Sequence, residues 1–122
     1  MANILIIDDD AYVRDVLVQV IGGAGHSTQV AGDGDKGLEL YRAGKPDLVV
    51  TDIMMPGKDG METIRELRAF DPNARIIAMS GGGRIRYTQV LEFARKLGAD
   101  DAIAKPFSNA ELLSRIAALL GR

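Results

Sequence analysis

The sequence predicts one α/β domain, in which helices cover both faces of a doubly wound parallel sheet. Short apolar runs alternate with longer amphipathic segments along the 122 residues, and this alternation is typical of the strand-helix units that build a parallel sheet. Four of the apolar runs also end in a polar residue suited to phosphate or metal chemistry. Open parallel sheets place their ligand sites at such strand ends, so both observations favour the same architecture.

Five apolar runs are predicted to be the strands. They are short and almost continuously apolar, as strands buried on both faces of a sheet are. We expect them at residues 3–8, 27–31, 47–52, 75–80 and 100–104. The amphipathic segments are predicted to be helices, and we expect these at residues 11–21, 34–43, 60–70, 84–97 and 109–120.

Apolar spacing in the first and last helical segments supports the helix assignment. In both, apolar residues recur at i, i+3, i+4 and i+7, which places them on one face of a helix. The expected core stripes are Val13, Val16, Leu17 and Val20 in the first segment and Leu113, Ile116, Ala117 and Leu120 in the last.

Helix ends are marked by glycines and by polar caps. Gly22-Gly23, Gly44 and Gly98 follow helical segments, where glycine most easily adopts a left-handed backbone. Ser108, with Glu111 three residues later, forms a capping box that starts the last helix. No linker or repeat divides the chain, so residues 1–122 are expected to form one domain.

Composition narrows the classes of function. A net charge of −2 with a pI of about 5.3 leaves no basic stripe for a nucleic-acid backbone, so we expect no direct nucleic-acid binding. The chain has no cysteine, which excludes thiolate catalysis and disulfides. No apolar stretch approaches the roughly 20 residues that cross a bilayer. We therefore expect a soluble, cytoplasmic protein without a membrane partner.

Carboxylates dominate the polar residues at the strand ends. Asp8, Asp9 and Asp10 follow the first run, and Asp52 ends the third. Carboxylates brought together at one sheet edge repel one another unless they share protons or bind a cation. Mg²⁺ (or Mn²⁺) is the expected cation, since Mg²⁺ takes oxygen ligands from one or two carboxylates. Asp10 is expected to cap the first helix instead.

Asp52 is the predicted chemical centre of this edge. Taken alone, it could be a polar strand end before the turn at residues 55–57. A carboxylate can also attack phosphorus and form an aspartyl phosphate where cations neutralise the incoming charge. Lys105 supplies such a cation, and Pro106 after it keeps its backbone extended. Ser80 ends the fourth run and can donate its hydroxyl to a phosphoryl oxygen.

Together these residues resemble the receiver domain of two-component response regulators (the CheY-like superfamily), over residues 3–121. The matching motifs are the acidic pair after the first strand, the segment Asp52-Ile-Met-Met-Pro-Gly-Lys-Asp-Gly60, Ser80 and Lys105-Pro106-Phe107. The resemblance implies a flavodoxin-like sheet with strand order 2-1-3-4-5. It also implies phosphorylation of Asp52 by a histidine kinase or a histidine phosphotransfer protein.

The resemblance further implies roles for individual residues. Asp9, Asp52 and the Met54 backbone carbonyl would bind Mg²⁺, with Asp8 assisting, while Ser80 and Lys105 would hold the phosphoryl group. The Lys105-Pro106 peptide would be cis. Such a domain is not an enzyme for other substrates, because it catalyses only its own phosphorylation and dephosphorylation.

Two departures from the family bear on signalling. The position three residues before the lysine usually carries an aromatic ring but here is Ala102, and the connection from Ser80 to Gly98 is longer than is typical. We hypothesise that Gly81 to Gly83 and the start of the next helix rearrange instead.

The expected readout surface comprises the fourth and fifth strands and the helices that follow them. Ile85 and Leu119 are the candidate contacts there for an unknown downstream protein, and a phosphorylation-dependent dimer is a further expectation. The chain is either a stand-alone receiver or part of a longer protein.

Two alternative functions remain open at the level of sequence. A small Mg²⁺-dependent phosphohydrolase would use Asp8 as nucleophile and Asp10 as acid/base. A degenerate receiver would act as a binding module that never carries phosphate, although Asp9, Asp52 and Lys105 are all present.

Overall fold

The alternation of strands and helices runs through the whole of the computed structural model, which describes residues 1–53, 60–81 and 87–121. The strands are β1 (Asn3–Ile7), β2 (Ser27–Ala31), β3 (Leu48–Asp52), β4 (Ile76–Ser80) and β5 (Asp101–Ala104). The helices are α1 (Ala11–Gly23), α2 (Gly34–Gly44), α3 (Gly60–Phe70), α4 (Tyr87–Leu97) and α5 (Asn109–Leu120). Every predicted element is therefore present, with ends that differ by a few residues.

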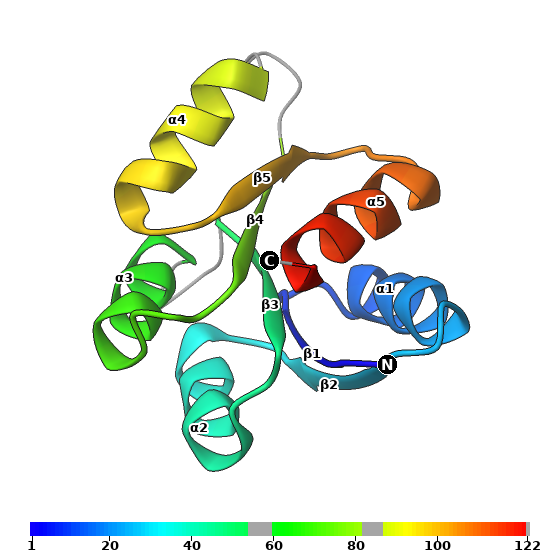
Figure 1. Cartoon of the computed structure of the whole chain (residues 1–122), viewed down its shortest axis with the longest axis horizontal. Helices are drawn as coiled ribbons and strands as arrows, with labels where there is room; N and C mark the ends of the chain where they lie inside the picture. Colours follow the sequence, from blue (N-terminus) through cyan, green and yellow to red (C-terminus); the bar gives the residue numbers. More distant parts are fainter. Residues whose placement is uncertain (54–59, 82–86, 122) are drawn as a thin grey trace.

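Within the described residues the strands form one parallel sheet of order β2-β1-β3-β4-β5, which confirms the predicted order. Helices α1 and α5 lie on one face, and α2, α3 and α4 lie on the other (Figure 1). Ile7 pairs with Ala31 and with Thr51, and Ser80 pairs with Ala104. Because the strands are parallel and end nearly level, the residues that follow them lie along one edge.

Alternate residues of the central strands enter two separate cores, as the pleat of a strand requires. Ile4 and Ile6 pack on the α1/α5 face, while Leu5 and Ile7 pack on the α2/α3/α4 face. All four side chains are buried. Burial on both faces explains why the strand sequences are apolar without alternation.

The predicted core stripes of α1 and α5 are partly wrong. In α1 the buried residues are Leu17 and Ile21, whereas Val16 is 39% exposed. In α5 they are Leu112, Ile116 and Leu119, so the core stripe is rotated relative to the prediction and Ala117 is exposed. The predicted and the observed core residues of α5 both follow helical spacing, and apolar residues occur on most sides of this helix. Periodicity alone therefore could not identify the buried face of α5. Leu119 is therefore a core residue and not an exposed partner contact.

The predicted polar caps begin α1 and α5, but only Gly98 of the three predicted glycine positions ends its helix as expected. Helix α2 runs through Gly44, and the left-handed residue after it is Lys45, with φ of 39°. The Asp10 carboxylate accepts a hydrogen bond from the Tyr12 N–H, and the Ser108 hydroxyl accepts one from the Glu111 N–H. Gly98 follows α4 with φ of 114°, a left-handed conformation that favours glycine. After α1 that role falls to Gly25, with φ of 98°, because the helix continues through Gly22-Gly23.

Among the described helices, none is both long and apolar enough to pass through a membrane.

A polar contact ties α2 to the segment that follows α3. The Tyr41 hydroxyl donates to Asp71 Oδ2 at 2.7 Å, and the Tyr41 and Phe70 rings meet edge to face with centroids 6.2 Å apart. Burial and this hydrogen bond raise the pKa of Tyr41. The same hydrogen bond, with that from the Asn73 N–H, lowers the pKa of Asp71.

Substitution Tyr41→Phe should lower the free energy of unfolding by about 1 kcal/mol near neutral pH, because Asp71 loses its donor while the ring remains. A carboxyl with a lowered folded-state pKa contributes stability above its unfolded pKa of about 3.9, and this stability is lost as the pH falls through the folded value. The difference between wild type and variant should therefore narrow below about pH 4. Urea unfolding near neutral pH and below about pH 4 measures this difference in the free energy of unfolding. Tyr12→Phe, at an exposed tyrosine, is the control. A difference independent of pH would contradict the assignment.

Candidate functional site

The strand ends bring together residues that are far apart in the sequence. Asp8 follows β1, Asp52 ends β3, Ser80 ends β4 and Lys105 follows β5. The backbone pairing continues past the strands, since the Asp8 N–H donates to the Ala31 carbonyl at 3.1 Å and the Lys105 N–H to the Ser80 carbonyl at 2.7 Å. These bonds hold Asp8, Lys105 and Ser80 along the carboxyl edge of the sheet, where the pairing of Asp52 with Met79 also places Asp52.

Three carboxylates converge at this edge. Asp8, Asp9 and Asp52 each offer an oxygen, and these oxygens lie within 4.8 Å of one another. Asp8 is fully buried, Asp52 is only 6% exposed, and Asp9 is exposed to solvent. Like charges this close disfavour one another's ionised form unless a cation is shared. The all-oxygen donor set, open on the Asp9 side, fits Mg²⁺, which keeps several waters when it binds carboxylates. The Met54 carbonyl, predicted as a further ligand, lies outside the described residues.

Lys105 places its ammonium group against two of these carboxylates. Its Nζ lies 3.0 Å from Asp8 Oδ2 and 3.5 Å from Asp52 Oδ2. Burial alone would lower the pKa of Lys105, but the hydrogen bond to Asp8 and the charges of Asp52 and Asp8 outweigh it and raise the pKa. The side chain is therefore a cation beside Asp52. The Lys105-Pro106 peptide is cis, as the resemblance implied.

Asp8 and Asp10 are both engaged by the local backbone. Asp8 Oδ1 accepts a hydrogen bond from the Asp10 N–H at 2.9 Å, and its other oxygen contacts Lys105. Asp10 caps α1 through its own carboxylate. A buried Asp8 with both oxygens bonded is not an accessible nucleophile, and Asp10 is not placed as its acid/base partner. The geometry thus offers no support for the phosphohydrolase alternative.

Ser80 and Ala102 lie on the adjacent strands β4 and β5, where Ser80 pairs with Ala104 and Ala102 pairs with Ala78. Ser80 is partly exposed at the end of β4, one residue beyond Met79, which pairs with Asp52. Ala102 is fully buried and packs with Ala94 and Leu97 in the core on the α2/α3/α4 face. The hypothesis that Gly81 to Gly83 and the next helix rearrange, and the contact assigned to Ile85, fall largely outside the described residues.

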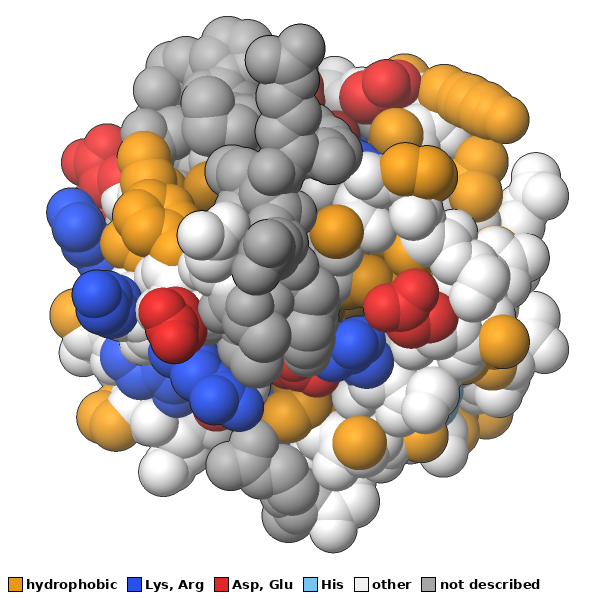
Figure 2. Space-filling model, turned by 90° about the horizontal axis from the view of Figure 1, so that it is seen from above, with side chains coloured by type: hydrophobic (Ala, Val, Ile, Leu, Met, Phe, Trp, Pro, Cys, Tyr) orange, Lys and Arg blue, Asp and Glu red, His pale blue; other side chains and the backbone are white. Residues whose placement is uncertain are grey.

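Charged side chains of both signs surround this edge. Figure 2, which looks at the molecule from above Figure 1, shows acidic and basic side chains next to one another on this face. At the strand ends themselves, Lys105 offsets part of the charge of Asp8 and Asp52.

Gly60 is a supporting residue to which no role was assigned from the sequence. Its N–H donates to the Ile53 carbonyl at 2.8 Å, and a Cβ at this position would overlap the backbone carbonyl of Asp52. Glycine is a poor helix former. A glycine as the first residue of a predicted helix was therefore the one sign in the sequence that the backbone is closely approached here. Only glycine lets α3 approach the acidic strand end this closely.

Substitution Gly60→Ala should destabilise the fold by about 1–3 kcal/mol, because the added methyl group meets backbone that cannot turn aside. Gly22→Ala is the matched control, since a Cβ at Gly22 meets nothing within 4 Å. Chemical denaturation of both variants measures the difference. Equal stability of Gly60→Ala and wild type would contradict the close approach.

The sheet order and the acidic edge define an open α/β domain with clustered carboxylates at its strand ends, where such sheets place their ligand sites. The family described as response regulator receiver domain matches residues 4–117, and the chain belongs to this family.

Relatives with longer chains share this domain. The chain is 40% identical over 122 residues to the DNA-binding response regulator MtrA of Mycobacterium tuberculosis, covering 98% of this chain and 51% of MtrA. It is 38% identical over 120 residues to the response regulator MprA of Mycolicibacterium vanbaalenii, covering 98% of this chain and 51% of MprA. The chain thus spans about half the length of these curated relatives.

Solved structures agree with the fold along the whole chain. A putative response regulator from Chloroflexus aurantiacus superposes with a TM-score of 0.91 at 30% identity, covering 99% of this chain and 98% of that one. The receiver domain of NtrX from Brucella abortus superposes with a TM-score of 0.88 at 30% identity, covering 97% and 98% of the two chains.

Proposed function

We propose that this receiver accepts a phosphoryl group on Asp52 from a histidine kinase or a histidine phosphotransfer protein, in a Mg²⁺-dependent reaction. The observation that carries the proposal is the position of Asp52, held between the carboxylates of Asp8 and Asp9 and the Lys105 ammonium group 3.5 Å away. Lys105, together with a cation held by the carboxylates, would neutralise charge where a phosphoryl group would arrive.

In the proposed reaction an Asp52 carboxylate oxygen attacks phosphorus as the phosphorus–nitrogen bond to the donor imidazole breaks, and the imidazole takes up a proton. The metal, held by Asp8, Asp9 and Asp52, would neutralise the developing charge on the phosphoryl oxygens. Lys105 then exchanges its contact with Asp52 for one with a phosphoryl oxygen, and Ser80 donates its hydroxyl to another. The chain turns over no other substrate in this proposal.

In this proposal the signalling response follows from the negative charge that phosphorylation adds at this edge. A phosphoryl group brings about two negative charges and three acceptor oxygens, and these favour the state in which Ser80 and Lys105 contact them. Because Ala102 offers no aromatic ring to move, we place the response in the segment from Gly81 onward and on the surface of α4, β5 and α5. A downstream protein, or a second phosphorylated copy, would bind there.

Incubation with acetyl phosphate and Mg²⁺ should add one hydroxylamine-labile adduct to the wild-type chain, as measured by intact mass. Asp52→Asn should carry no adduct, because the nucleophile is gone, while Asp35→Asn, on the exposed surface of α2, should behave as wild type. An adduct on Asp52→Asn would overturn the site assignment. The absence of any adduct on the wild type would favour the degenerate receiver, a binding module.

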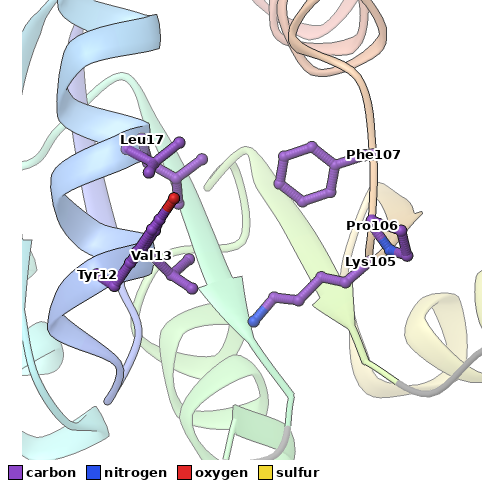
Figure 3. A pocket seen from close by; sticks show the side chains of 7 residues that line it. Tyr12, Val13, Leu17, Lys105, Pro106 and Phe107 are labelled. Carbon is purple, nitrogen blue, oxygen red and sulfur yellow. The ribbon is translucent and has the colours of Figure 1, made fainter.

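An apolar pocket beside Lys105 suits the approach of a protein donor. Tyr12 and Val16 on α1 line one side, and Pro106 and Phe107 line the other, around a volume of about 300 Å³. Figure 3 shows the Tyr12 and Phe107 rings on opposite sides, with the Lys105 side chain extending below them toward α1. Tyr12 is 66% exposed. A donor that brings phosphohistidine to Asp52 could bury this surface, whereas a small phosphate donor would not need it.

Val16→Asp should therefore slow phosphorylation by a phosphohistidine protein about 10-fold relative to phosphorylation by acetyl phosphate, as a charge placed in an interface centre does. The donor is any phosphotransfer protein that phosphorylates the wild type, and both rates are followed by intact mass. Val30→Asp on β2, where the valine is 43% exposed, is the matched control and should change neither rate. Equal slowing with both donors would contradict docking at this pocket.

A further inference from the structure

The turn from β1 to α1 carries two of the three clustered carboxylates, and other elements hold its backbone. The Asp8 N–H donates to the Ala31 carbonyl at 3.1 Å. The Asp8 carbonyl accepts a hydrogen bond from Arg14 Nη1 at 2.8 Å. The Asp8 side chain is bonded to the Asp10 N–H and to Lys105. Asp8 is thus anchored through its backbone and through its side chain.

Asp9 depends on this anchoring because it is exposed and follows directly. The peptide group between Asp8 and Asp9 is planar, so the orientation of its carbonyl also sets the direction in which the chain enters Asp9. Arg14 binds that carbonyl. The Arg14 guanidinium therefore acts on the peptide from which the Asp9 carboxylate reaches the cluster.

The guanidinium lies against the turn after β2, in space that Gly32 leaves open. A Cβ on Gly32 would lie 3.3 Å from Arg14 Nη1, which is closer than ordinary van der Waals contact. The absence of a side chain at Gly32 thus leaves the room that Arg14 occupies. Arginine suits this position because its planar, rigid fork loses little freedom on forming a hydrogen bond, whereas a lysine ammonium is a flexible point charge.

We propose that Arg14 is a positioning residue for the metal site: it holds the Asp8–Asp9 peptide so that Asp9 faces Asp52 and completes the Mg²⁺ ligand set. This inference rests on the proposed Mg²⁺ binding. Arg14 touches neither the metal nor the phosphoryl group in this account. It acts through the turn, as residues outside the ligand set commonly orient metal ligands.

Arg14 could affect Mg²⁺ affinity through its positive charge or through its hydrogen bond to the Asp8 carbonyl, and the two predict opposite effects of removing it. A cation near the site repels Mg²⁺, so loss of the charge alone would tighten metal binding. Loss of the hydrogen bond frees the Asp8–Asp9 peptide and weakens binding, and removal of such supporting contacts typically costs at least about 10-fold in metal affinity. The positional effect is the larger in our proposal, so the direction of the change tests it.

Calorimetric titration with Mg²⁺ alone provides the test on the full chain. We expect Arg14→Met to bind about 10-fold more weakly than wild type and Arg14→Lys to recover part of the loss. Gly32→Ala, which presses on the same guanidinium, should show a smaller loss in the same direction. Gly23→Ala is the control, since a Cβ there meets nothing within 4 Å. Urea unfolding without Mg²⁺ shows which variants are folded.

Unchanged or tighter Mg²⁺ binding by a folded Arg14→Met would overturn the inference while leaving the proposed function intact. If Arg14→Met does not fold, the Mg²⁺ affinities of Arg14→Lys and Gly32→Ala test the inference instead. Affinities equal to that of the wild type in both variants would overturn it. Absence of Mg²⁺ binding by the wild type would instead overturn the proposed metal-dependent function, and the inference with it.

Discussion

Repulsion among three carboxylates at one edge of the sheet is the constraint on which the account depends. Asp8, Asp9 and Asp52 present oxygens within 4.8 Å of one another, and the two from the strand ends are almost fully buried. Lys105, which follows β5, offsets part of this charge. In the proposed function the remaining negative charge would bind a divalent cation, and cation and lysine together would make Asp52 a nucleophile toward an anionic phosphoryl group.

The fold supplies the rigidity that such crowding requires. Asp8 follows β1 and Asp52 ends β3, and both strands contribute side chains to the cores on the two faces of the sheet. The two carboxylates therefore cannot move apart without disturbing those cores. Gly60 lets α3 pack against the Asp52 carbonyl, and Gly32 leaves room for Arg14 beside the Asp8 turn. Gly60 and Gly32, at the periphery of the site, thus help to position the charged residues at its centre.

The element types and the polar strand ends could be predicted from the sequence because each depends on local pattern. Apolar runs and capping residues define the strands and most helix ends, and parallel strands bring their carboxyl ends together whatever the side chains. The buried face of α5 could not be chosen, since Leu112, Ile116 and Leu119 compete with an equally helical set. The roles of Gly60 and Arg14 were also missed, because they arise from contacts made across a turn, with the backbone of Asp52 and Asp8, which no helical or strand periodicity indicates.

The most direct test of the central claim is a crystal of this chain grown with Mn²⁺ and examined by anomalous diffraction, since Mn²⁺ replaces Mg²⁺ at oxygen-rich sites. The account predicts one strong anomalous peak at the carboxyl edge, within coordination distance of oxygens of Asp9 and Asp52 and close to Asp8. An edge without a peak, at a Mn²⁺ concentration that supports phosphorylation, would contradict it.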